Sequence, residues 1–220
     1  MSTSRTPLDR LRVIDAAIAL ADDDGLDATT MRRLADRLEV TPMALYKHVG
    51  SREDLIDGMV DRLVGALPPA SASSEHWQTA LTARIIAARA ALGVHPWAQD
   101  AIETRTLASP VVLGYMDSLM EIMFAGGLSA DLVHHGMHAL STRMWGFTRD
   151  VMPTPAVPDD PAARDAALAA FQSAFPAIVR MATTASHAGS SCDDDAEFRF
   201  ALDLLLDGLE RRRAAGWMPG

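Results

Sequence analysis

The sequence predicts an all-α protein in two parts, a small unit of three short helices followed by a larger helical domain. Residues that favour helices dominate the chain, whereas aromatic residues make up only 5% of its 220 residues. No segment shows the alternation of apolar and polar residues that indicates a half-buried strand. Because 49% of the residues are hydrophobic, the chain can bury a sizeable core.

The first helix is expected to begin near residue 8 and to end before Gly25. Its apolar residues recur every three or four positions, which places them on one face: Leu8, Leu11, Ile14, Ile18 and Ala21. A second, short helix is expected from about Thr30 to Leu38.

The third helix starts with two residues typical of a helix N-terminus. Thr41 carries a hydroxyl able to cap free backbone N–H groups, and Pro42 occupies the first helical position, where no N–H is needed. This helix is expected to end near Val49 and Gly50. Its length and the short turn before it are typical of a helix-turn-helix, whose second helix enters a DNA groove.

A fourth helix is expected over residues 51–67, because Ser51 begins a capping box and Pro68 stops the apolar pattern. Residues 68–74 (PPASASS) then read as a linker. Later helices are expected over about 75–93, 109–126, 129–150, 162–183 and 194–214. Irregular segments are expected between them, over 94–108, 151–161 and 183–192.

The last predicted helix is apolar over about 240° of its circumference, far more than the ~100° of an ordinary surface helix. The apolar residues are Phe198, Phe200, Ala201, Leu202, Leu204, Leu205, Leu206 and Leu209. Such a helix either lies in the middle of its own domain or buries a second face against another copy of the chain. We favour the second copy, because terminal helices tend to lie at domain edges.

Basic residues gather in one part of an otherwise acidic chain. The whole chain carries a formal charge of −9, but residues 28–52 hold five basic and two acidic residues, a local charge of +3. The basic residues are Arg32, Arg33, Arg37, Lys47 and Arg52, with Arg5, Arg10 and Arg12 just upstream. A local cationic surface suits a specific anionic partner, and the acidic remainder suppresses loose attachment.

The side chains around the third helix fit contacts with DNA. Thr41, Pro42, Met43 and Ala44 are small or apolar enough to sit against base edges. Tyr46, Lys47 and His48 are hydrogen-bond donors suited to phosphate oxygens. Arg32 is the best candidate to read guanine, since a guanidinium binds O6 and N7 together. The alternative is a pair of helices whose basic residues simply face solvent and bind no DNA. The proline, the length of the turn and the local charge all agree with a helix-turn-helix and therefore favour DNA binding.

Residues 8–67 resemble the amino-terminal domain of the TetR/AcrR family of bacterial transcriptional repressors. The matching residues are Ile14-x-x-Ala17, Gly25, Thr30-Met31-Arg32-Arg33-Leu34-Ala35, Val40-Thr41-Pro42-Met43-Ala44-Leu45-Tyr46-Lys47-His48-Val49 and Leu55. The resemblance implies a homodimer on a palindromic operator and a helical domain that binds a small molecule and releases DNA. By position, it implies that Arg32 and residues 41–44 face bases and that residues 46–48 hold phosphates.

Two positions depart from the family pattern. Glu39 stands where glycine is common, and a left-handed backbone there costs a non-glycine residue about 1 kcal/mol. Val49 stands where phenylalanine is common, which affects packing alone.

Residues 75–214 are similar to the tetracycline-repressor-type regulatory domain through Gly93-Val94-His95-Pro96-Trp97 and the apolar run over 200–209. Effector-binding candidates are the polar or soft side chains on apolar helices, since methionine and aromatic walls adapt to varied ligands. They are Trp97, Arg105, Met116, Met120, Met123, His134, His138, Met144, Trp145, Phe171 and Phe175. Some of them will instead be ordinary core residues.

Other classes of protein have less support in the sequence. A helical enzyme is one alternative, but no nucleophile elbow, phosphate loop, dinucleotide fingerprint or paired-carboxylate site is present. A metal-binding sensor using His134 and His138 is another, although no partner carboxylate or cysteine is evident. A helical scaffold would leave the basic residues of 28–52 unexplained. No metal or cofactor is therefore expected.

The remaining signals indicate a cytoplasmic protein without membrane attachment. Every apolar run meets a charge before the ~18 residues needed to cross a bilayer. Because Cys192 is the single cysteine of the sequence, an internal disulfide is excluded. The acidic residues that follow it disfavour a reactive thiolate.

Three parts are therefore expected. Residues 1–50 form a DNA-binding domain, residues 51–74 a connecting helix and linker, and residues 75–214 a ligand-binding and dimerisation domain. Two copies are expected to pair through the helices near 129–150 and 194–214.

Overall fold

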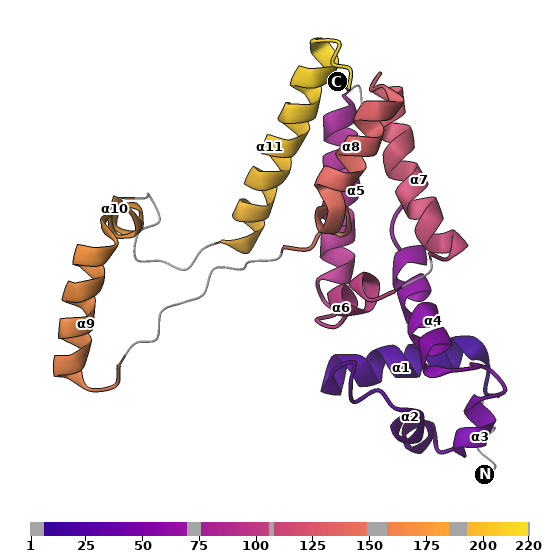
Figure 1. Ribbon diagram of the computed structural model, residues 1–220. Helices are drawn as coiled ribbons and strands as arrows, with labels where there is room; N and C mark the ends of the chain where they lie inside the picture. The colour runs from indigo at the N-terminus through magenta and orange to yellow at the C-terminus, as the bar shows by residue number, and fades with distance from the viewer. Residues whose placement is uncertain (1–6, 70–75, 106–107, 149–157, 185–192, 220) are drawn as a thin grey trace. The chain divides into compact units, whose positions relative to one another are not determined.

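A computed structural model describes residues 7–69, 76–105, 108–148, 158–184 and 193–219 of the chain (Figure 1). Within these ranges every regular element is a helix, as the sequence predicts. The chain divides into two compact units, one formed by Met1–Phe147 with Leu202–Gly220 and the other by Thr148–Ala201. No helix of the described ranges is both long and apolar enough to span a bilayer.

The first four helices form a small helical unit, here called the head (residues 10–65). The helices α1 (Arg10–Asp24), α2 (Met31–Leu38) and α3 (Pro42–Leu45) lie around the N-terminal end of α4 (Arg52–Gly65) (Figure 1). Their shared core comprises Val13, Ile14, Ala17, Leu20, Leu34, Ala35, Leu45, Val49, Leu55, Met59 and Val60. α1 and α4 approach closely, since a Cβ at Gly58 would lie 2.7 Å from Cδ1 of Ile14.

Two details of the head differ from the sequence prediction. Leu11 is 60% exposed, because the buried face of α1 is centred on Val13, Ala17 and Leu20. α3 ends at Leu45 instead of near Val49. After Leu45 the chain continues as a hydrogen-bonded turn, in which the Leu45 carbonyl accepts from His48 N–H at 2.8 Å and from Val49 N–H at 3.0 Å.

The helix starts of the head are capped largely as the sequence predicts. The Ser51 hydroxyl accepts from Asp54 N–H at 3.1 Å, and the Thr30 hydroxyl accepts from Arg33 N–H at 3.3 Å. Pro42 occupies the first helical position of α3. Thr41, in contrast, makes no side-chain capping bond, so its hydroxyl is left for another partner.

Glu39 ends α2 in the left-handed conformation, with φ 54° and ψ 44°. Val40 N–H donates to the Ala35 carbonyl at 3.0 Å and Glu39 N–H to the Asp36 carbonyl at 3.2 Å. This pair of bonds is the Schellman arrangement, which normally uses glycine at the left-handed position. The turn therefore adopts the left-handed geometry that favours glycine despite its glutamate.

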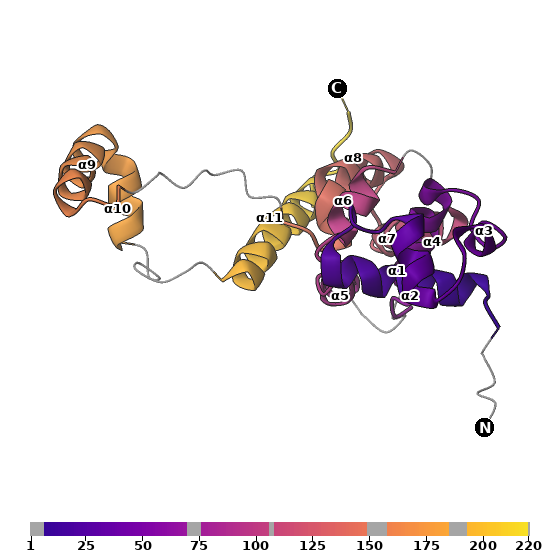
Figure 2. The same ribbon diagram turned by 90° about the horizontal axis from the view of Figure 1, so that it is seen from below.

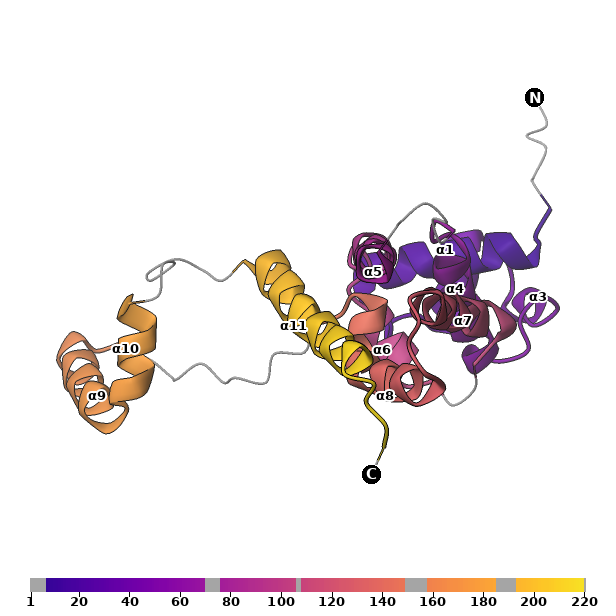
Figure 3. The same ribbon diagram turned by 90° about the horizontal axis from the view of Figure 1, so that it is seen from above.

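A larger group of helices, here called the body, follows the head. It comprises α5 (Trp77–Leu92), α6 (Ala98–Glu103), α7 (Pro110–Ala125), α8 (Ala130–Leu140) and the part of α11 from Leu202 onward (Figure 3). α4 packs against α5, α6 and α7, so it joins the head to the body. A Cβ at Gly136 would lie 2.5 Å from Met123 and 3.2 Å from Leu209, which places α8 tightly between α7 and α11.

Two predictions for the body are wrong. Residues 94–108, expected to be irregular, contain the short helix α6. The helix expected over 129–150 ends at Leu140 and continues as a 3₁₀ helix, Ser141–Trp145. Side chains from distant helices bind the end of this 3₁₀ helix. The Tyr115 hydroxyl donates to the Met144 carbonyl, and the Arg89 guanidinium donates to the carbonyl of Gly146, the residue after the helix, at 2.8 Å.

The second unit contains α9 (Pro161–Ala174) and α10 (Pro176–Thr184), where one helix over 162–183 was expected. Pro176 breaks that helix, because proline has no N–H to donate and its ring clashes with the preceding turn. No side chain of α9 is buried. Cys192 and most of the predicted linker and loops (70–74, 151–157 and 185–192) lie outside the described residues.

α11 (Asp194–Ala214) has the length that the sequence predicts, and its apolar surface is divided in two. Phe198, Leu202, Leu206 and Leu209 are buried. Phe200 and Leu204 are 63% and 56% exposed in the single chain. Part of the apolar surface of this helix is therefore uncovered in the single chain.

Candidate DNA-binding surface and effector pocket

α3 and the turn after it present most of the predicted DNA-contacting side chains to solvent. In each of the three views α3 lies at the rim of the head (Figure 1, Figure 2, Figure 3). Thr41, Pro42, Lys47, Met43 (72% exposed) and Tyr46 (47% exposed) are exposed, and Ala44 and His48 are partly exposed. Buried Leu45 and Val49 anchor this segment to the core.

Most basic side chains of the head hold the fold together. On α2, Arg33 pairs with Asp24 at 2.6 Å and Arg37 with Asp23 at 2.8 Å, both at the end of α1. Arg52 donates to the Leu26 carbonyl at 3.0 Å. Each of these groups is therefore committed to another part of the head.

Arg10, at the start of α1, is held in the same way. It pairs with Asp54 at 2.6 Å and also donates to the His48 carbonyl at 2.8 Å. The hydrogen bond from Arg10 lowers the pKa of Asp54 below its ordinary value. This pair ties α1 to the start of α4 and to the turn after α3.

Arg32 and Lys47 are different. Of the five basic residues in 28–52, these two make no ion pair or side-chain hydrogen bond with any residue that the structure describes. Both are exposed. Within residues 28–52, the positive charge available to an anionic partner is therefore concentrated on two side chains, one from α2 and one after α3.

Two clusters on either side of α6 connect the body to the head. Before α6, Asp22 of α1 accepts from Trp97 Nε1 at 2.7 Å and lies 2.8 Å from Nδ1 of His95. Trp97 is buried, and it lines a cavity of about 730 Å³ between the end of α1 and α6. Trp97, predicted as an effector contact, is thus placed at the junction with the head.

After α6, Arg105 and Ser109 contact two carboxylates of α4. Arg105 Nε lies 2.9 Å from Asp57 Oδ1, and Arg105 Nη1 lies 3.5 Å from Asp61 Oδ1. The Ser109 hydroxyl caps α7 and donates to the same Asp61 oxygen at 2.5 Å. The side chain of Arg105 is only 8% exposed. The segment around α6 is therefore fastened to α1 at one end and to α4 at the other.

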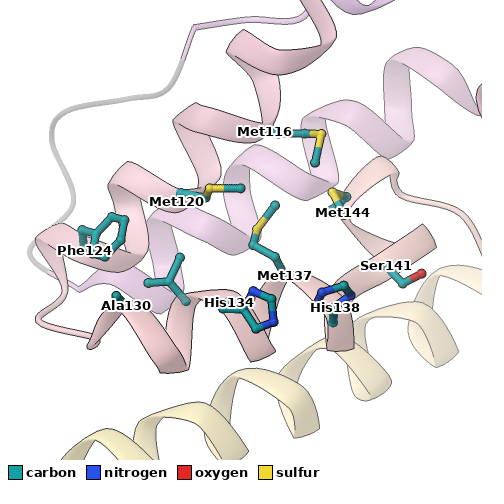
Figure 4. A pocket seen from close by; sticks show the side chains of 10 residues that line it. Met116, Met120, Phe124, Ala130, His134, Met137, His138, Ser141 and Met144 are labelled. Carbon is teal, nitrogen blue, oxygen red and sulfur yellow. The ribbon is translucent and has the colours of Figure 1, made fainter. Parts of the chain in front are cut away.

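A pocket of about 450 Å³ lies between α7, α8 and the 3₁₀ helix (Figure 4). It is lined by Met116, Met120, Phe124, Ala130, Val133, His134, Met137, His138, Ser141 and Met144. Met116, Met120, His134, His138 and Met144 are candidates from the sequence that the structure brings together here. Its volume falls within the range of small-molecule sites.

The other sequence candidates lie elsewhere. Trp145 stacks on Tyr115 with ring centroids 4.8 Å apart, and Met123 is fully buried in the core. Phe171 and Phe175 contact each other, 5.0 Å apart, in the second unit.

Sequence reasoning missed the other five lining residues, Phe124, Ala130, Val133, Met137 and Ser141. Phe124 lies four residues after Met120, and Met137 lies three residues after His134. Helical spacing from these nominated residues could therefore have identified both as pocket residues. Ser141 lies three residues after His138, so the same spacing applied to it. Among the described residues, no group of three or more His, Cys, Asp or Glu side chains is placed so that it could hold a metal ion.

The chain belongs to the TetR family. Residues 13–59 match the family of bacterial regulatory proteins of the tetR type, and residues 69–213 match the tetracyclin repressor-like C-terminal domain. These matches confirm the resemblance seen in the sequence, including the type of carboxyl-terminal domain.

Relatives and solved structures agree with this membership. The chain is 32% identical over 136 residues, or 61% of its length, to an HTH-type transcriptional regulator of Saccharopolyspora erythraea. It is 31% identical over 54% of its length to the repressor DrrR1 of Streptomyces coeruleorubidus. The chain spans about half the length of these curated relatives, 58% and 44% respectively.

A structural match covers nearly the whole chain. The crystal structure of ActR from Streptomyces coelicolor in complex with actinorhodin superposes with a TM-score of 0.73 at 25% identity. The match covers 94% of this chain and 99% of ActR.

Proposed function

We propose that this protein is a homodimeric transcriptional repressor that binds a palindromic DNA operator and is released by a small, mostly apolar effector. The observation that carries the proposal is the exposed segment from Thr41 to His48, flanked by the uncommitted cations Arg32 and Lys47. An exposed helix with free cations suits a DNA-binding regulator better than an enzyme. Residues 1–50 form the DNA-binding domain, and residues 75–214 bind the effector and the second copy of the chain. Residues 51–74 connect these two parts.

The DNA contacts divide into two kinds. Arg32, Thr41, Pro42, Met43 and Ala44 face base edges, where a guanidinium, a hydroxyl and methyl groups discriminate between base pairs. Tyr46, Lys47 and His48 follow at the end of the segment and bind phosphates, which fixes the register without reading sequence.

The effector acts through the pocket between α7 and α8. ActR, a protein of this fold, is described in complex with a small molecule, which supports an effector site in the body. α7 lines the pocket with Met116 and Met120, and its capping residue Ser109 bonds to Asp61 of α4. A displacement of α7 is therefore passed directly to α4, the helix that carries the head.

The signal also reaches the head through α6. Arg105 joins this segment to Asp57 and Asp61 of α4, and Trp97 joins it to Asp22 of α1. Equivalent groove positions on one face of DNA recur every ~34 Å, so a change of a few ångströms in the separation of two heads is enough to lower affinity.

Dimerisation uses the exposed apolar face of α11, together with α8. Phe200 and Leu204 would otherwise leave large apolar surfaces in water. Leu204→Arg, on this exposed face, is expected to give a monomer in sedimentation velocity, whereas Arg199→Glu, an exposed position about 140° away on the same helix, leaves a dimer. A Leu204→Arg variant that stays dimeric would place the interface elsewhere.

The whole proposal is tested by gel shift on the DNA upstream of the protein's own gene, at several salt concentrations. A sequence-specific repressor shifts this DNA and leaves unrelated DNA unshifted at the same concentration. An enzyme or a scaffold gives no sequence-dependent shift, and that result would overturn the proposal.

A further inference from the structure

A second cavity lies at the junction of the head and the body. It has a volume of about 730 Å³ and is found where α6 meets the end of α1 and the start of α4 (Figure 1). This volume falls within the range of small-molecule sites. Leu26, Asp27 and Ile56 line it from the head, and Trp97 and Asp100 line it from the segment around α6. A molecule bound here therefore contacts the head and the body at once.

The walls of this cavity carry a surplus of negative charge. Four aspartates and one arginine line it, which gives a formal charge of −3. Asp24 is paired with Arg33, and Asp22 is bonded to the segment before α6. Asp27 and Asp100, in contrast, make no ion pair or side-chain hydrogen bond with any residue that the structure describes, and both are exposed. These two carboxylates are therefore free to bind a cation.

Apolar side chains form much of the remaining wall. Leu26 and Ile56 are partly buried, and Trp97 is buried. Carboxylates beside such a wall attract a cation more strongly than they would in bulk water, because the effective dielectric is lower. A ligand with an apolar body gains further by covering this wall. An anion would lose hydration and meet charge of its own sign.

A compact metal ion does not fit this arrangement. Divalent cations take several oxygen ligands at once, and the described residues contain no group of three His, Cys, Asp or Glu side chains near enough to one another for that. An ammonium group on an organic molecule offers three hydrogen-bond donors and can bind carboxylates that lie apart. The cavity therefore suits an organic cation.

We infer that this cavity is a second ligand site, which binds an organic cation with an apolar body, and that Asp27 and Asp100 hold the charged group. The inference goes beyond the proposed function, because the cavity shares no lining residue with the pocket between α7 and α8. A cation bound here fastens the loop after α1 to α6, and so favours one arrangement of head and body. Its regulatory consequence rests on the proposed function: because the operator also binds the head, operator and cation change each other's affinity by the same factor.

Three probes with the same two-ring skeleton test the class of ligand. At pH 7, 2-(aminomethyl)naphthalene carries an ammonium group, 2-naphthalenemethanol is neutral, and 2-naphthoate is an anion. Binding of each to the full-length protein is measured by isothermal titration calorimetry without DNA. The amine is expected to bind about tenfold more tightly than the alcohol, and the naphthoate more weakly than both. Equal or tighter binding of the alcohol or the naphthoate would overturn the inferred class of ligand.

Variants of the two free carboxylates test the location of the site. The double variant Asp27→Asn, Asp100→Asn is expected to weaken binding of the amine by about fivefold or more and to leave binding of the alcohol within about twofold. The matched control is Asp36→Asn, Glu121→Gln, which removes two exposed carboxylates outside the cavity and changes the net charge equally. The control is expected to bind the amine as the unaltered protein does. Thermal melts establish that both variants remain folded.

The outcomes separate the site, its regulatory effect and the proposed function. Unchanged binding of the amine in the double variant, or an equal loss in the control, would overturn the site. Gel shifts at constant ionic strength with a saturating concentration of the amine measure the coupling, which is expected to change operator affinity by about threefold or more. An unchanged affinity would overturn the regulatory effect while leaving the site in place. Loss of the shift without any ligand refutes the proposed function but not the site, because the calorimetry needs no DNA.

Discussion

α2 and the segment around α3 both carry basic side chains, but they use them for different purposes. On α2, Arg33 and Arg37 are paired with carboxylates at the end of α1. Arg32, their neighbour in sequence, and Lys47, after α3, have no such partner among the described residues. The local charge of +3 in residues 28–52 therefore overstates the positive charge that is free to bind an anion. Asp23 and Asp24, just upstream of this segment, neutralise two of its arginines through ion pairs. A cluster of arginines predicts a DNA-binding surface only after its internal partners are known.

The largest expected effect is that of Arg32→Ala on operator binding. Loss of a bidentate base contact should cost about 1–3 kcal/mol, a reduction of roughly tenfold to a hundredfold in affinity. The variant should also lose its preference at one position of the operator. Gel shifts with a set of operators, each altered at a single base pair, measure both effects.

Arg33→Ala is the matched control for that experiment. It removes the neighbouring arginine, whose ion pair with Asp24 is about half exposed and stabilises the fold by roughly 0–1 kcal/mol. Operator affinity should change by less than about threefold, since this side chain is committed to α1. If Arg33→Ala weakened binding as much as Arg32→Ala, the distinction between paired and unpaired arginines would be wrong.

Lys47→Ala should have a smaller and more uniform effect. A phosphate contact carries no sequence information, so affinity should fall by a similar factor for all operators. The dependence of log affinity on log salt concentration should become shallower by about one, as one fewer counterion is released. Titrations at four or more salt concentrations give this slope, and an unchanged slope would show that Lys47 does not contact a phosphate.

The sequence predicted the head better than the body, for physical reasons. Caps and short spacings determine local structure, so the capping box at Ser51 marked the start of α4 correctly. The break at Leu140, where α8 ends, depends instead on bonds from Tyr115 and Arg89 to distant carbonyls, which no local pattern encodes. Pro176 was a local signal that was overlooked.

The same division holds for the candidate site. Residue type and helical spacing were enough to nominate Met116, Met120, His134 and His138, which the structure brings into one pocket. They were not enough to place Trp97 and Arg105, whose partners Asp22, Asp57 and Asp61 lie about forty to eighty residues away in the chain. Long-range pairing of this kind requires the fold.

The turn that joins α2 to α3 tests how much the head tolerates strain between these two helices. Glu39→Gly should raise the free energy of unfolding relative to Glu39→Ala by about 1 kcal/mol, because only glycine adopts the left-handed conformation without a steric cost. Both variants remove the same carboxylate, so their difference isolates the backbone. Urea unfolding followed by circular dichroism measures it, and equal stabilities would mean that the turn relaxes when its side chain is changed.

The smallest expected effect concerns the pH dependence of stability, and it extends the comparison to Arg10, another arginine that holds the fold. Hydrogen bonding to Arg10 lowers the pKa of Asp54 below its ordinary value of 3.8. Asp54 therefore contributes stability that is fully present above that ordinary value and is lost as the pH falls through the lower, folded-state value. In Asp54→Asn this contribution is absent at every pH. Between pH 5 and pH 2 the unaltered protein should lose more stability than the variant, as measured by urea unfolding at each pH. Because Arg10 also donates to the His48 carbonyl, it should stay in place when its partner Asp54 is removed, and the salt dependence of operator binding at neutral pH should be unchanged. A change in that slope would mean that Arg10, once released, joins the DNA-binding surface.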